Sequence, residues 1–252
     1  MSNPAEQRAS KVPEVTLIFW IIKIAATTLG ETGGDAVSMS MNLGYLVGTA
    51  IFAVIFIVAV AFQIAATRFR PFLYWTTIIA TTTVGTTLAD FADRSLGIGY
   101  AGGTTLLLAL LLASLLVWHR TQGSVSISTV NTPRVEAFYW VTIMFSQTLG
   151  TALGDWTADS AGLGYLGSAA VFTGLLALIV AAYYRTKLSH TLLFWAAFVL
   201  TRPLGAVLGD FLDKPLDKGG LNLSRYTATA VLLAFIIACI AFIPQRTAKR
   251  TH

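Results

Sequence analysis

Long apolar segments alternate with short polar connections along the whole chain. Eight segments each approach the roughly 20 apolar residues that a helix needs to cross a bilayer. Little sequence is left over for a soluble domain. The pattern therefore predicts an all-α polytopic membrane protein with eight transmembrane helices. These segments cover residues 14–34, 43–67, 72–90, 97–118, 135–154, 163–184, 192–209 and 222–243.

One set of fixed positions recurs in every second predicted helix. A tryptophan is followed ten residues later by a glycine and fifteen residues later by an aspartate, which always follows a glycine or alanine. Fifteen helical residues extend about 22 Å at ~1.5 Å per residue, so each copy is most of one membrane crossing. The copies are Trp20, Gly30 and Asp35; Trp75, Gly85 and Asp90; Trp140, Gly150 and Asp155; Trp195, Gly205 and Asp210.

Each repeat contains a motif helix and a return helix, so all four motif helices are predicted to run in the same direction. Such parallel repeats are related by an axis along the membrane normal. Asp35 to Asp155 and Asp90 to Asp210 both span 120 residues. The chain is therefore predicted to be two duplicated four-helix halves, residues 1–120 and 134–252, joined by a cytoplasmic linker at 121–133. Four motif helices around one axis would bring their acids to one depth.

Composition and charge support this interpretation and orient the chain. The sequence is 55% hydrophobic and 12% charged, with a mean hydropathy of +0.70, whereas soluble domains carry roughly 25% charged residues. Eleven lysines and arginines fall on the side of the two termini, and four fall on the other side. Because positive residues accumulate in cytoplasmic loops, both termini are predicted to be cytoplasmic. The net charge of +5 is assigned to this rim and to anionic lipid, so no nucleic-acid partner is expected.

The ends of the chain and of its helices suggest where the protein resides. Residues 1–14 are polar and lack the apolar core of a signal peptide, so no cleavage is expected. We expect the bacterial cytoplasmic (inner) membrane. Aromatic residues at both helix ends are interpreted as interfacial anchors. They are the aromatic-Trp pairs at the motif-helix starts, and Tyr45, Tyr100, Tyr165 and Tyr226 at the opposite side.

The face of each motif helix below its aspartate is polar from the middle to the acidic end. Residues four apart share a helix face. Ionisable residues within a membrane usually face a bundle interior or a water-filled cavity, and the motif glycines permit close helix approach. Steps of four lead through Lys23, Thr27 and Glu31 to Asp35; Ile78, Thr82 and Thr86 to Asp90; Ile143, Gln147 and Thr151 to Asp155; Phe198, Arg202 and Ala206 to Asp210.

This convergence of oxygen atoms is typical of a site for a hard divalent cation. Lys23 and Arg202 would neutralise the empty site, and Lys23 is a candidate for proton exchange because a buried lysine readily changes its pKa. The predicted metal ligands are Glu31, Asp35, Asp90, Asp155 and Asp210. The predicted transport and coupling residues are Lys23, Thr27, Thr82, Gln147 and Arg202.

The preferred hypothesis is transport of a divalent metal cation such as Mn²⁺, with protons as candidate coupling ions. We expect no tightly bound cofactor and no enzymatic activity, since the sequence has no glycine-rich phosphate loop and no catalytic triad pattern. Two alternatives stay open. One is a structural or ligand-binding module whose acids cap loops; the other is a proton-coupled organic cation carrier with cation-π surfaces. The ion, the transport direction and the oligomeric state, a homo-oligomer included, also stay open.

The repeated Gly-x3-[Gly/Ala]-Asp motif with its following Gly-Tyr resembles a family of bacterial multi-pass membrane proteins that are mostly uncharacterised. This resemblance covers nearly the whole chain, and its link to metal-resistance gene clusters favours export. Glu31-Thr-Gly-Gly-Asp35 is also loosely similar to the Glu-x-Gly-Asp-[Lys/Arg]-[Ser/Thr] motif of calcium/manganese cation exchangers, with one extra residue between the acids. That second similarity implies a divalent cation as the substrate.

Overall fold

A computed structural model describes residues 10–248, which form a bundle of eight α-helices with no strand among the described residues. Outside this range lies most of the N-terminal segment for which no cleavage is expected. Three of the basic residues counted on the side of the termini also lie outside it: Arg8, Lys249 and Arg250. The predicted number of helices is confirmed. The helices are α1 (Leu17–Asp35), α2 (Gly44–Ala65), α3 (Pro71–Asp90), α4 (Gly99–Gln122), α5 (Pro133–Asp155), α6 (Gly164–Arg185), α7 (His190–Asp213) and α8 (Arg225–Phe242).

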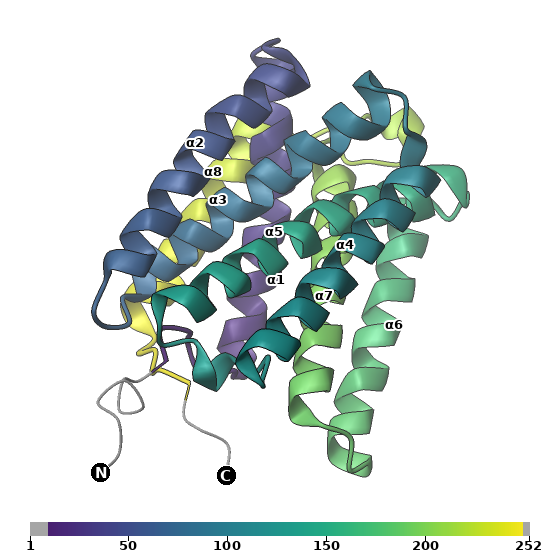
Figure 1. Cartoon of the computed structure of the whole chain (residues 1–252). Helices are drawn as coiled ribbons and strands as arrows, with labels where there is room; N and C mark the ends of the chain where they lie inside the picture. Colours follow the sequence, from purple (N-terminus) through teal and green to yellow (C-terminus); the bar gives the residue numbers. More distant parts are fainter. Residues whose placement is uncertain (1–9, 249–252) are drawn as a thin grey trace, which may run out of the picture.

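The four motif helices form a closed inner ring in the order α1, α3, α5, α7 and back to α1. Each return helix packs on the motif helix of the next repeat: α2 on α3, α4 on α5, α6 on α7, and α8 on α1. Figure 1 shows α2 beside α3 and α6 beside α7. The contact of the last helix with the first closes the ring, so the four repeats enclose one common interior.

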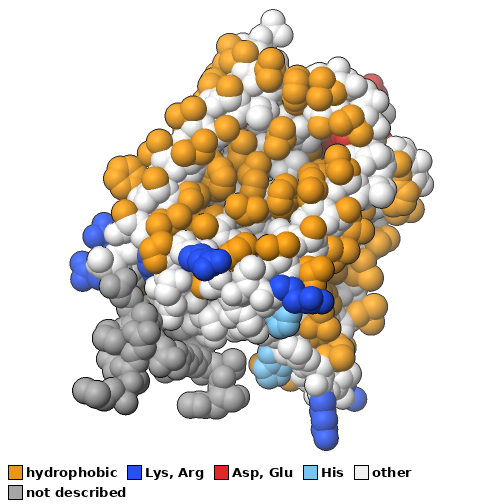
Figure 2. Space-filling model, in the orientation of Figure 1, with side chains coloured by type: hydrophobic (Ala, Val, Ile, Leu, Met, Phe, Trp, Pro, Cys, Tyr) orange, Lys and Arg blue, Asp and Glu red, His pale blue; other side chains and the backbone are white. Residues whose placement is uncertain are grey.

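The outer helices present an apolar surface. Leu178 on α6, Ile57 on α2 and Val231 on α8 are each more than 60% exposed. In Figure 2 hydrophobic side chains cover most of the visible face, and Lys and Arg gather toward one end of it. Five helices, α2, α4, α6, α7 and α8, are long and apolar enough to cross a membrane. These features are consistent with a membrane protein.

The motif glycines let neighbouring motif helices approach closely. A Cβ atom at Gly30 would lie 2.4 Å from Thr82, and one at Gly205 would lie 2.1 Å from Thr27. Gly85 faces Gln147 and Gly150 faces Arg202 in the same way. Each motif glycine thus packs against a residue of a neighbouring repeat. In every case this residue lies seven positions after the tryptophan of its own repeat. This explains why glycine occurs at this position in all four copies.

The starts of three return helices, α2, α4 and α6, also depend on glycine. Gly44, Gly99 and Gly164 are the first residues of α2, α4 and α6, and all have a φ between +64° and +77°. Glycine adopts this left-handed conformation without the strain that a Cβ atom would introduce. After α1, α3 and α5, a five-residue π-helical turn continues the helix toward this glycine: η2 (Ala36–Ser40), η3 (Phe91–Ser95) and η5 (Trp156–Ser160).

Seven of the eight residues of the aromatic-Trp pairs are buried in the core, so their interpretation as interfacial anchors is wrong for all but the partly buried Trp20. Tyr74 and Tyr139 have no exposed surface, and their hydroxyl groups lie 2.6 Å apart. Trp75 and Trp140 are 1% and 2% exposed. Non-helical segments of the chain cover this end of the ring and contribute Val12 and Val130 to the same core. The helical periodicity of the sequence does not predict where these segments lie. At the opposite end Tyr165 is buried too, whereas Tyr226 is 49% exposed.

The two ends of the described chain meet at this aromatic end of the bundle. Pro13 and Thr247 form an isolated antiparallel bridge. Lys11 forms an ion pair with Glu136 of α5 at 2.6 Å and donates hydrogen bonds to two carbonyls at the end of α2. The N-terminal segment is thereby tied to three parts of the chain. This arrangement places residues 10–16 and 244–248 on the same side, as the sequence predicts for the termini.

Candidate functional site

The four repeated aspartates lie inside the bundle at the end opposite the aromatic residues. Each is at most 3% exposed. The backbone continues helically past Asp35, Asp90 and Asp155, which keeps their side chains on the inner face. None of these three makes a side-chain hydrogen bond as the N-cap of its π-helical turn. The capping role considered as an alternative is therefore not observed for them.

Two basic side chains join the aspartates in pairs. Arg94 contacts Asp90 at 2.8 Å and Asp155 at 3.0 Å. Lys214 contacts Asp35 at 2.6 Å and Asp210 at 2.9 Å. Each pair combines acids from neighbouring repeats. The charges consequently have an approximate twofold arrangement, although the aspartates themselves repeat fourfold.

Sequence reasoning missed these two contacts because it counted Arg94 and Lys214 as ordinary outer-loop charges. The signal was present in the spacing. Each follows a motif aspartate by four residues, which on a continuing helix puts the base over the acid. The equivalent positions in the first and third repeats are Met39 and Asp159. When the repeat is extended by one helical turn past its aspartate, the sequence shows a basic residue at this position in the second and fourth repeats only.

The acids around Lys214 favour its charged form. Burial acts to lower its pKa, but Asp210, Asp35 and Asp213 oppose this effect strongly enough to raise the pKa well above its ordinary value. Arg225 adds a third base to the same group, at 2.9 Å from Asp213 and 3.7 Å from Asp35. A positive charge next to Asp35 is thus a fixed part of this structure.

The structure brings together some of the predicted metal ligands and separates others. Glu31, Asp35 and Asp90 each offer a carboxylate oxygen, and these oxygens lie within 4.8 Å of one another. A second group of the same compactness joins Asp35 and Asp210 to Asp213, a residue that the sequence did not single out. Asp155 belongs to neither group and pairs with Arg94 instead.

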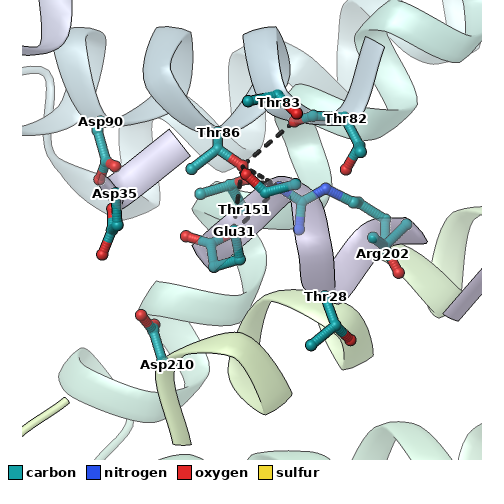
Figure 3. A network of polar contacts seen from close by, with 12 residues as sticks. Thr28, Glu31, Asp35, Thr82, Thr83, Thr86, Asp90, Thr151, Arg202 and Asp210 are labelled. Carbon is teal, nitrogen blue, oxygen red and sulfur yellow. Dashed lines mark hydrogen bonds and ion pairs between the residues drawn. The ribbon is translucent and has the colours of Figure 1, made fainter. Parts of the chain in front are cut away.

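Arg202 lies one helical level below the aspartates and holds Glu31 in place (Figure 3). Its Nη2 donates to Glu31 Oε2 at 3.1 Å, to Thr86 Oγ1 at 2.6 Å and to the Thr151 hydroxyl. The Thr86 hydroxyl also donates to Glu31 Oε2 at 3.3 Å. Three motif helices are joined to α7 through this one guanidinium group.

The remaining predicted coupling residues are buried but differ in their contacts. Thr27 Oγ1 donates to the carbonyls of two residues of its own helix and to the Thr201 carbonyl of α7. Lys23 lies 3.4 Å from Thr201 Oγ1 and 4.1 Å from the centre of the Phe198 ring. The hydroxyl of Thr82 and both amide atoms of Gln147 have no hydrogen-bond partner within residues 10–248. These residues line the interior, as the four-residue spacing predicts.

The observed structure is thus an all-helical bundle of four repeats that has an apolar exterior and a charged interior. The chain belongs to the family described as Repeat of Unknown Function (DUF347), whose model matches residues 18–69, 73–124, 138–189 and 193–247. Each match contains one motif helix and its return helix, which confirms the prediction of a fourfold repeat family. No curated protein and no solved structure matches the chain.

Proposed function

We propose that this protein is an integral membrane transporter for a divalent cation such as Mn²⁺, which binds at Glu31, Asp35 and Asp90. The observation that carries the proposal is the grouping of three buried carboxylates from α1 and α3 within 4.8 Å. Carboxylate oxygens are the ligands that hard divalent cations prefer. Thr86, whose hydroxyl already contacts Glu31, would supply a neutral oxygen to the same ion.

The charge of the acidic end supports a divalent ion. Through Arg94, Lys214 and Arg225, ion pairs join five carboxylates, those of Asp35, Asp90, Asp155, Asp210 and Asp213. When all eight groups of this ion-pair network are ionised, five acids and three bases leave two negative charges uncompensated, the charge that one divalent cation neutralises. An uncompensated buried charge is costly, so an ion at this position would stabilise the fold. Glu31 does not alter the balance, because Arg202 compensates it.

Lys214 and Arg202 supply a way to exchange the ion. In the structure they contact Asp35 and Glu31, two of the three proposed ligands. An arriving ion would compete with these tethered cations for the carboxylates, and a departing ion would be replaced by them. Transport would also require the contact of Tyr74 with Tyr139 to open, because these residues fill the ring at its other end. We propose proton exchange as the coupling and export as the direction.

A transport assay tests this proposal. Purified protein in liposomes is expected to move Mn²⁺, and the variant Glu31→Gln/Asp90→Asn is expected to fall to the level of protein-free liposomes because two of three charged ligands are lost. Asp159→Asn is the matched control, since this acid is exposed on the turn after α5. Both variants are first checked for a folded, monodisperse state. A folded double variant that transports Mn²⁺ like the parent would refute the proposal.

We further propose that both termini face the cytoplasm of a bacterial inner membrane. The test introduces single cysteines into a Cys239→Ala background, because Cys239 is the one native cysteine. A membrane-impermeant maleimide is expected to label Asp217→Cys in intact cells, and Thr121→Cys only after lysis. Both positions are exposed, so access depends on the side of the membrane. The reverse labelling would place the termini outside.

A further inference from the structure

Several buried polar atoms in the middle of the inner ring lack partners among the described residues. They are the Nε and Nη1 atoms of Arg202, both amide atoms of Gln147 and the hydroxyl of Thr82. The three side chains have no exposed surface. An unpaired polar group away from water costs about 1–3 kcal/mol. A group of them at one level therefore indicates a bound species that accepts hydrogen bonds.

These atoms belong to residues at one repeat position in the middle of the motif helices. Thr82, Gln147 and Arg202 each stand seven residues after a motif tryptophan, and each packs against the motif glycine of a neighbouring helix. Lys23 lies one helical turn nearer the aromatic end, where its ammonium group has a 3.4 Å contact with Thr201. These side chains thus come from all four motif helices and line two successive levels of the axis.

Basic side chains in this part of the ring outnumber the acids that contact them. Arg202 is compensated by Glu31 at 3.1 Å. Lys23 is also fully buried, but it forms no ion pair with any carboxylate in the described part of the chain. One basic group is consequently left without a negatively charged partner, and most of the unpaired atoms one level above it are hydrogen-bond donors.

We propose that a single small monovalent anion of the size of chloride binds at this level, held by Lys23, Arg202 and Gln147. An anion supplies the missing negative charge and accepts hydrogen bonds from the free N–H groups of Arg202 and Gln147. The ion must be small, because the side chains around it are fully buried and because the other three residues at the repeat position of Lys23 are the bulky Ile78, Ile143 and Phe198. The cation site at Glu31, Asp35 and Asp90 is a separate feature on which this proposal does not rest.

Thermal unfolding of the full-length protein in detergent tests the proposal. With EDTA present to remove divalent ions, the melting temperature is expected to rise and saturate as chloride replaces gluconate at constant ionic strength. Lys23→Met and Gln147→Leu are expected to lose this dependence. Lys187→Met carries the same substitution on an exposed lysine and is expected to keep it. A melting temperature that is independent of chloride in the parent protein would overturn the proposal.

Crystals grown in bromide give a second test that needs no variant. An anomalous peak between Lys23, Gln147 and Arg202 is expected. Its absence, or density for water alone at this level, would mean that water satisfies these groups and that Lys23 is an uncharged amine, which also overturns the proposal. Both measurements are made without divalent ions, so a failure of the cation-transport hypothesis leaves their outcome unchanged.

Discussion

Replacement of Arg202 by methionine is expected to lower the free energy of unfolding by about 3–5 kcal/mol, because removal of one partner of a buried ion pair strands the other charge. Glu31 is 2% exposed and has Arg202 as its basic partner. The same change removes the hydrogen bonds to Thr86 and Thr151. Unfolding of the detergent-solubilised protein by denaturant measures the loss.

A double-mutant cycle separates the ion pair from the packing of the arginine side chain. Arg202→Met/Glu31→Met removes both charges and is expected to recover most of the stability lost in Arg202→Met, since an apolar pair of similar volume often replaces a buried ion pair without loss. Arg185→Met is the control, because Arg185 is exposed at the end of α6. If the double variant is no more stable than Arg202→Met, the stability is due to arginine packing and the ion pair is not its source.

Substitution of Gly205 by alanine is the second large expected effect, with a loss of about 1–3 kcal/mol from overpacking. The added Cβ would lie 2.1 Å from Thr27 Oγ1, 2.5 Å from Thr27 Cβ and 2.9 Å from the Thr27 carbonyl carbon. Because a backbone atom is among these contacts, rotation of Thr27 cannot relieve them. Helices α1 and α7 would have to separate. Unfolding measurements of the same kind detect the change.

Gly174→Ala provides the control for this prediction. Gly174 is in the interior of α6, and a Cβ atom there meets nothing within 4 Å. The higher helix propensity of alanine is expected to leave stability unchanged or raise it, by up to about 1 kcal/mol. Thr27→Ala combined with Gly205→Ala is expected to recover little, since the close Cβ and backbone contacts persist. An equal effect of the two single substitutions would show that close packing of the ring is not the reason for the motif glycine.

The two predictions concern different properties of the interior. Gly205 occurs at a position that is the same in all four repeats, so its substitution tests how the ring is assembled. Arg202 and Glu31 each occur at their position in one repeat only, so their substitution tests what distinguishes the repeats. The proposed cation and anion levels both depend on the second kind of residue. A variant of Arg202 or Glu31 that keeps an intact ring but no longer responds to a cation or anion would therefore identify these non-repeated residues as the functional ones.

Much of this fold could be predicted from the sequence because its determinants are local and repeated. The period of the apolar segments gives eight helices, and steps of four from Asp35 to Lys23 identify an inner face that the structure confirms as buried. The spacing of Trp75, Gly85 and Asp90 recurs in every motif helix, and this defines the repeat. These are properties of single helices, for which 3.6 residues per turn fix the direction of each side chain.

The tertiary structure alone decided which side chains meet. The order of the ring places Glu31 and Asp35 of α1 against Asp90 of α3. Asp155 is outside this group and contacts Arg94. Lys214 reaches Asp35 across 179 residues, and no helical period encodes a contact between helices that are distant in the chain. The sequence could place the aromatic pairs at a helix end. Only the tertiary structure shows that other parts of the chain cover them. Periodicity fixes the face of a helix, whereas long side chains and ring closure determine its partners.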